Sequence, residues 1–167
     1  MTEEDIKIIP AEELEKLKEC EEVKTEDFEE LKEIGEAMIK YCVNNGGLGL
    51  AAPQIGINKK MFVWANATNS FQIVFNPEIL FSNNKKKTNV IEQCLSYPDE
   101  HYLVERYKNI RIKFNYFDNG EFKTYFRNLS NERAFIFQHE NDHINCITIA
   151  QKGKRLNVER EEKEEDK

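Results

Sequence analysis

The 167-residue sequence lacks a long apolar run, and this absence argues against a protein that crosses a membrane with helices. A spanning helix needs roughly 20 consecutive apolar residues, and no stretch of the chain approaches that length. The first residues, Met-Thr-Glu-Glu-Asp, are acidic and do not lead into the apolar segment of a secretory signal. A cytoplasmic protein is therefore expected.

Basic residues are also in the minority. The chain has 24 lysines and arginines against 31 aspartates and glutamates, and its formal net charge is −7, so a broad surface for nucleic acid is not expected. The four cysteines include no closely spaced pair, which favours free thiols over a disulfide framework. The length predicts one domain, which we place at residues 1–150, followed by a charged, flexible tail at 151–167.

Hydrophobic spacing predicts the helices. Residues 27–44 carry apolar side chains at intervals of three and four, including Val43, which is the pattern of a helix with one buried face. Propensity favours a shorter helix at residues 11–18. Residues 134–137 are apolar all round, so the helix that they begin, with Ser130 as its expected N-cap, should be buried.

Aromatic and β-branched residues predict strands at 61–65 and 71–75, with Asn76-Pro77 ending the second. A polar, lysine-rich loop is expected at 82–88. The alternating run 110–116 and the run 122–126 flank Asp118-Asn119-Gly120, which predicts a hairpin because Asn-Gly tolerates positive φ.

The expected buried helix also contains residues 138–143, QHENDH. His139 and His143 are four residues apart, so on a helix both imidazoles can reach one metal ion. Glu140 lies beside them, where a base acting on metal-bound water is needed. Two histidines with ordinary core partners are the alternative, but several polar side chains in an apolar helix favour a metal site.

Two histidines do not complete a metal site, and the residues alone leave the third ligand open. No histidine follows His143, and downstream glutamates such as Glu159, Glu161 and Glu162 lie in the expected tail, where a well-fixed ligand is not expected. Upstream, Cys94 ends an expected strand and His101 is the one remaining histidine. Among the other thiols, Cys146 and Cys42 lie on helix sides where packing is the commoner role.

Three segments together resemble the motifs of peptide deformylases. Residues 47–54 (GLGLAAPQ), 92–96 (EQCLS) and 138–143 (QHENDH) stand in the order of that family's GxGLAAxQ, EGCLS and QHExDH motifs. The resemblance covers about residues 6–150. It implies an α+β fold, with antiparallel β-sheets packed around a central helix bearing HExxH, plus an N-terminal helix. It also implies less helix at 11–18 than propensity suggests, and the short C-terminal region resembles phage-type members of the type 1 class.

The resemblance implies a metal centre and a reaction. Cys94, His139 and His143 would bind one divalent ion, whose water would attack the formyl carbon of an N-terminal formylmethionine while Glu140 acts as general base and then acid. Family likeness favours Fe²⁺, and one thiolate with two imidazoles also suits Zn²⁺, Ni²⁺ or Co²⁺. The reaction would release formate.

Further residues follow from the same resemblance. The Gln54 side chain and the Leu95 backbone N–H would stabilise negative charge on the formyl oxygen. Arg106 and Asp142 would form an ion pair behind the ligands. The peptide edge and the methionine pocket would be built from Leu48, Gly49, Val90, Gln93, Phe135 and Ile136.

The implied partners are N-formylmethionyl peptides of nascent chains, near the ribosome exit. Direct binding of nucleic acid or membrane is not expected. The protein is expected to be a monomer in the cytoplasm of a bacterium or of a phage-infected bacterium. Two alternatives remain open at this point. One is an HExxH metallopeptidase, and the other is a non-catalytic deformylase-fold module that binds N-termini.

Three residues depart from the family's motifs. Gln93 replaces the glycine of EGCLS and would be strained if that position needs positive φ. Cys146 replaces the glycine usual after HExDHxN. Glu132 places a charge near the expected rim of the pocket. We expect these departures to affect rate and specificity more than metal binding.

Overall fold

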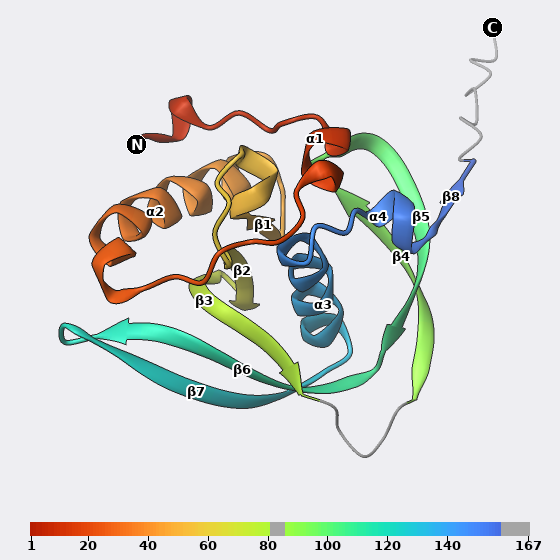
Figure 1. Ribbon diagram of the computed structural model, residues 1–167. Coiled ribbons are helices and arrows are strands. Elements are labelled where there is room, and N and C mark those ends of the chain that lie inside the picture. The colour runs from red at the N-terminus through yellow and green to blue at the C-terminus, as the bar shows by residue number, and fades with distance from the viewer. Residues whose placement is uncertain (81–85, 158–167) are drawn as a thin grey trace, which may run out of the picture.

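A computed structural model describes residues 1–80 and 86–157 (Figure 1). Its α-helices are α1 (Ala11–Lys16), α2 (Phe28–Asn44), α3 (Glu132–Ile144) and α4 (Ile149–Lys152). Short 3-10 helices occur at η1 (Glu3–Asp5), η2 (Thr25–Asp27) and η3 (Ala52–Ile55). The strands between them pair in two antiparallel sheets.

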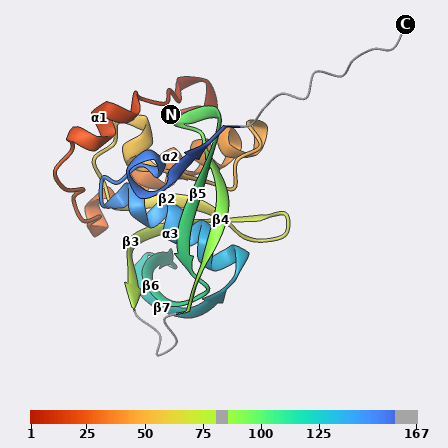
Figure 2. The same ribbon diagram turned by 90° about the vertical axis from the view of Figure 1, so that its right-hand side faces the viewer.

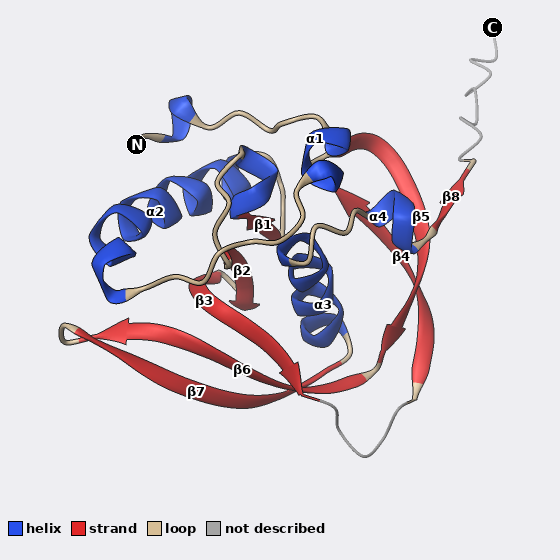
Figure 3. Ribbon diagram, in the orientation of Figure 1, coloured by secondary structure: helices blue, strands red, loops and turns tan. Residues whose placement is uncertain are grey.

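One sheet has five strands in the order β1-β2-β3-β6-β7. These strands are β1 (Gly49–Ala51), β2 (Met61–Ala67), β3 (Ser70–Leu80), β6 (Asn109–Asp118) and β7 (Glu121–Ser130). The other sheet has the order β4-β5-β8 and comprises β4 (Lys87–Cys94), β5 (Tyr97–Tyr107) and β8 (Lys154–Leu156). This α+β arrangement of antiparallel sheets and helices confirms the expected fold class (Figure 3).

Helix α3 lies at the centre of the molecule. Figure 1 shows it between β1–β3 on one side and β4–β5 on the other, and in Figure 2 β4 and β5 pass in front of it. Its Phe137 ring packs edge-on against Phe62, with ring centroids 5.0 Å apart, and against Trp64 at 5.2 Å. The apolar run at 134–137 therefore buries the helix, as the sequence predicted.

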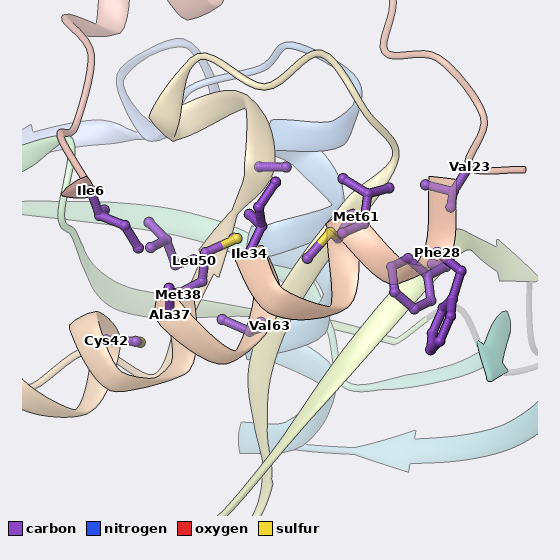
Figure 4. Close-up of a cluster of buried hydrophobic side chains, with 13 residues drawn as sticks. Ile6, Val23, Phe28, Ile34, Ala37, Met38, Cys42, Leu50, Met61 and Val63 are labelled. Carbon is purple, nitrogen blue, oxygen red and sulfur yellow. The ribbon is translucent and has the colours of Figure 1, made fainter. Parts of the chain in front are cut away.

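Strand β2 is the middle layer, because both of its faces are buried. Met61 and Val63 belong to the hydrophobic cluster under α2, shown in Figure 4, whereas Phe62 and Trp64 face the cluster under α3. Alternate residues of a strand point to opposite faces, so one short apolar run serves two cores. The sheet thereby fixes α2 and α3 on opposite sides.

Several predicted elements match closely. Helix α2 begins one residue after the expected start, although Val43 is 54% exposed and not on its buried face. The hairpin turn has Asn119 at φ 50° and Gly120 at φ 84°, as its sequence indicated. Helix α1 ends at Lys16, so residues 17 and 18 are not helical and this segment has less helix than propensity predicted, as the resemblance implied. No helix among the described residues is long and apolar enough to cross a membrane.

Other predictions were wrong. Asn76-Pro77 does not end β3; the chain absorbs the proline at a register shift between Phe75 and Glu78, where Asn76 has φ 48°, and continues to Leu80. Ser130 does not cap α3. It ends β7 and donates to Asn109 Oδ1 at 2.8 Å.

The predicted C-terminal tail and the predicted lysine-rich loop also differ from the structure. The tail expected from residue 151 is folded as far as Leu156, because α4 and β8 follow Thr148 and β8 pairs with β5. Residues 158–167 lie outside the described residues. Of the loop expected at 82–88, residues 82–85 also lie outside them, and residues 87 and 88 belong to β4.

Candidate active site

Helix α3 and the end of β4 bring three metal-binding atoms together. His143 Nε2 lies 3.2 Å from His139 Nε2 and 3.5 Å from Cys94 Sγ, and the three ligand atoms are all within 4.8 Å of one another. Bonds of about 2.1 Å to nitrogen and 2.3 Å to sulphur place tetrahedral ligands roughly 3.4–3.7 Å apart. The residues present therefore fit a divalent ion.

Both imidazoles are oriented by their other nitrogen. His139 Nδ1 donates to Glu92 Oε1 at 2.8 Å, and His143 Nδ1 donates to the Ile147 carbonyl at 3.1 Å. These contacts leave each Nε2 directed at the shared point, an arrangement typical of metal-ligating histidines. Burial raises the pKa of the Cys94 thiol, but His143 and His139 outweigh it and hold that pKa well below its usual range. The thiolate, which is the form that binds metal, is favoured.

Behind the histidines, Arg106 joins two carboxylates. Its Nε and Nη2 donate to Glu92 at 2.8 and 2.9 Å, and its Nη1 donates to Asp142. Burial raises the pKa of Glu92, but the hydrogen bonds from Arg106 and His139 lower it to about 2. The expected pair of Arg106 and Asp142 is thus present. Glu92 was missed, although its place two residues before Cys94, on the same side of β4, was an available signal.

Glu140 is buried between the ligands and β1. Its Oε2 has no hydrogen-bond partner among the described residues. Burial raises its pKa to about 7, against the opposing effect of both histidines. Gly49 gives the carboxylate its room, since a Cβ there would lie 2.4 Å from Glu140 Oε1. The group is thus placed to accept and return a proton near neutral pH.

Gln54 is held beside the sulphur. Its Oε1 accepts from the Ala51 N–H at 2.9 Å. Its Nε2 donates to Ser96 Oγ at 3.0 Å and lies 3.5 Å from Cys94 Sγ. The side chain is almost fully buried, and these bonds fix its amide next to the metal-binding atoms.

A cleft of about 650 Å³ opens over these residues. Strand β1 ends one sheet and β4 ends the other, and both line the cleft, so two strand edges face its contents. Gln54, Leu95 and Glu140 line it. So do all six residues expected to bind the peptide: Leu48, Gly49, Val90, Gln93, Phe135 and Ile136.

The departures from the motifs have different outcomes. Gln93 does not have positive φ, so the strain considered for it does not arise. Cys146 does, at φ 60°, and its N–H bonds to the His143 carbonyl at the end of α3. Glu132 lines the cleft as expected. His101, a sequence candidate for the third ligand, is not in the cluster of Cys94, His139 and His143 but also lines the cleft.

Comparison with known proteins agrees with this geometry. The family model described as polypeptide deformylase matches residues 4–159. The chain belongs to this family. The deformylase of Thermotoga maritima is 39% identical over 122 residues, which are 72% of this chain and 71% of the relative. That of Fusobacterium nucleatum is 32% identical over 124 residues, 74% and 69% of the two chains.

Solved deformylase structures share the fold. The crystal structure of the Thermotoga maritima enzyme has a TM-score of 0.77 and 32% identity, covering 88% of this chain and 96% of that one. A Met-Ala-Ser-bound class I type b deformylase from Acinetobacter baumannii has a TM-score of 0.77 and 26% identity, covering 88% and 97%. This chain is therefore a metal-dependent deformylase, a hydrolase that removes the formyl group from the N-terminal formylmethionine of newly made proteins.

Proposed function

We propose that Cys94, His139 and His143 hold the catalytic metal ion, and that the ion is Fe²⁺. The spacing of the three donor atoms, next to the buried carboxylate of Glu140, carries this assignment. One thiolate and two imidazoles also suit Zn²⁺, Ni²⁺ and Co²⁺, and Fe²⁺ is the choice that likeness to the family favours. A divalent ion held there would supply acidity to a water molecule at neutral pH and polarise the formyl oxygen.

Glu140 is the proposed proton carrier. Its Oε2, which no described residue hydrogen-bonds, accepts the proton of the attacking water as the oxygen approaches the formyl carbon. When the carbon–nitrogen bond breaks, Glu140 returns that proton to the leaving amine, so formate and a free N-terminus result. Burial raises its pKa to about 7 in the metal-free protein, and a bound cation would lower that pKa and favour the ionised form that accepts the first proton.

Negative charge on the formyl oxygen is stabilised by Gln54 and Leu95. The Gln54 amide is fixed by Ala51 and Ser96, so it needs no reorganisation as charge develops. Leu95 follows Cys94 in the chain and lines the cleft, where its backbone N–H is the second proposed donor. Arg106 and Asp142 hold α3 against β5 and so keep the ligands in register.

The peptide is proposed to lie between the outer edges of β1 and β4. Backbone pairing to Gly49 and Gln93 would give affinity with little demand on sequence. The methionine side chain fits the apolar part of the cleft, which is lined by Leu48, Val90, Phe135 and Ile136. Met-Ala-Ser bound to the Acinetobacter baumannii relative supports peptides of this kind as ligands.

The setting of the reaction follows from the substrate. We infer that the protein acts in the bacterial cytoplasm, near the ribosome exit, since formylated nascent chains arise there and the curated relatives named above are bacterial. We propose that it works as a monomer. Its catalytic domain is proposed to extend through β8, because that strand pairs with β5.

Formate release tests the proposal directly. Protein loaded with Fe²⁺ without oxygen is expected to release formate from formyl-Met-Ala-Ser and to leave internal peptide bonds intact. Glu140→Ala should retain one metal ion per chain and lose at least about 100-fold in turnover. Glu105→Ala, which changes an exposed acid of β5, is the control. Unchanged turnover in Glu140→Ala would remove the proposed base, and internal cleavage would indicate a peptidase.

A further inference from the structure

Gln93 and His101 face each other across the β4–β5 hairpin. Glu92 pairs with Tyr102, so Gln93 and His101 are the next opposed residues, immediately before the register shifts. The amide nitrogen of Gln93, Nε2, is the atom that lies next to His101 Nε2, and both residues line the cleft. The glycine that the deformylase motif has at position 93 could not make this contact.

The surroundings of His101 decide which way the amide turns. Its Nδ1 is buried and has no hydrogen-bond partner among the described residues. A proton on Nδ1 would therefore be an orphaned buried donor, which is rarer than an orphaned acceptor. The tautomer that avoids this orphaned donor carries its proton on Nε2, and a half-turn of the Gln93 amide then lets Oε1 accept the hydrogen bond. The Gln93 NH₂ group is then free of His101.

Gln93 is exposed and lines the cleft. The reacting formyl group would lie inward, beside Cys94, which is buried. A peptide that pairs with the edge strand β4, as proposed above, passes beside Gln93. A long polar side chain here lies within reach of an added strand.

We propose that Gln93 is a substrate-recognition residue positioned by His101, a proposal that rests on the proposed function. Its NH₂ group donates a hydrogen bond to the peptide beyond formylmethionine. His101 is a positioning residue, because it holds the amide oxygen and thereby aims the nitrogen. The pair adds recognition of peptide length to a site whose chemistry needs only the formyl group.

The test compares a long and a short substrate, formyl-Met-Ala-Ser and formyl-Met, in wild type, Gln93→Gly, Gln93→Glu and His101→Ala. Gln93→Glu is the matched control, since it can still accept from His101 Nε2 but has no NH₂ group. All three variants should lower the ratio of kcat/KM for the long over the short substrate by about fivefold, the effect of one hydrogen bond. Combining Gln93→Gly with His101→Ala should lower it no further, because both remove the same contact.

Calorimetric binding of the products Met-Ala-Ser and methionine gives a readout that does not need turnover. The tripeptide should lose affinity in each variant, whereas methionine should not. Equal effects on long and short ligands would overturn the proposal and indicate a purely structural role for the pair. The two proposals fail separately. If wild-type protein released no formate, the proposed function would be rejected. If Gln93→Gly kept the wild-type preference for binding Met-Ala-Ser over methionine, the recognition role would be rejected.

Discussion

Gly49 has no side chain at the point where β1 passes the carboxylate of Glu140. A Cβ at this position would lie 2.4 Å from Oε1 and 2.6 Å from Cδ of Glu140, closer than real Cβ atoms approach other groups. Since α3 fixes the Glu140 backbone, its side chain would have to move. The glycine is therefore required by the proposed general base, even though its own φ is not positive.

Gly49→Ala should consequently lower kcat by about 100-fold, the scale expected when a catalytic group is displaced by about 1 Å. Metal content should stay at one ion per chain, because none of the proposed ligands is contacted. The measurement is formate release with metal analysis. Gly35→Ala is the control, since its Cβ would meet Ile73 and Met61 in the core under α2 and should reduce stability without a comparable loss of kcat. Wild-type turnover by Gly49→Ala would contradict this account of Glu140.

Gln93 and Cys146 show what a motif can and cannot predict for a single residue. Both replace glycines, and the sequence indicated that each departure mattered. The backbone of Gln93 does not have positive φ, whereas Cys146 adopts φ 60° and closes α3. The alignment with a motif gives the position of a residue but not its dihedral angles. Those depend on the turn in which tertiary packing places it.

At the scale of elements, the ion network of Arg106 connects β4, β5 and α3. Arg106 is 2% exposed, and its partners Glu92 and Asp142 are 9% and 15% exposed. Removing the cation would leave two largely buried carboxylates without Arg106, with only His139 beside Glu92 and Lys152 beside Asp142, and breaking such a group by deleting one partner is costly. The network therefore stabilises the junction between the three-stranded sheet and the helix that carries the histidines.

Acid should weaken this junction in a defined range. The pKa of Glu92 is about 2 in the folded protein against 4.5 ordinarily, so its stabilisation is complete above pH 4.5 and is lost as pH falls toward 2. Urea unfolding of the metal-free proteins measures this effect. The free energy of unfolding of wild type should exceed that of Glu92→Gln at pH 6, and this difference should shrink by on the order of 3 kcal/mol by pH 2.

Glu105→Gln is the matched control for this acid-dependent effect. Glu105 lies on β5 and pairs with Lys87, but its side chain is 59% exposed. Exposed pairs contribute little because water screens them, so this variant should follow wild type at every pH. If the stability of Glu92→Gln fell with pH as that of wild type does, Glu92 would not be the group whose protonation destabilises the fold.

The elements that sequence predicted well are those with a strong local signal. Helix α2 and the β6–β7 hairpin follow from apolar spacing and an Asn-Gly turn. The errors arose where tertiary contacts decide. Asn76 takes positive φ in a bulge while its amide bonds to the Val23 carbonyl at 3.0 Å, so β3 continues through Pro77. A partner 53 residues away leaves no mark on local propensity.

At the scale of the whole molecule, the site lies where three parts of the chain meet. Cys94 comes from the three-stranded sheet, the histidines come from α3, and Gln54 follows β1 of the five-stranded sheet. The HExxH spacing predicts two ligands because both lie on one helix. Cys94 is 45 residues earlier in the sequence than His139, so local spacing could not identify it as a ligand. Its assignment came from the order of the family's motifs. Glu92 was missed because its partners come from two other elements.

Because the three ligands belong to two separate elements, metal removal should loosen the fold as a whole. An ion that binds only the folded state at about 1,000 times its Kd adds about 4 kcal/mol of stability. For a domain of this size, that corresponds to roughly 10 °C in Tm. Cys94→Ala should abolish most of the metal-dependent rise in Tm, whereas Cys20→Ala, which changes a buried thiol away from the cluster, should retain it. Thermal unfolding with and without Zn²⁺ measures both, and a full rise in Cys94→Ala would place the ion on other residues.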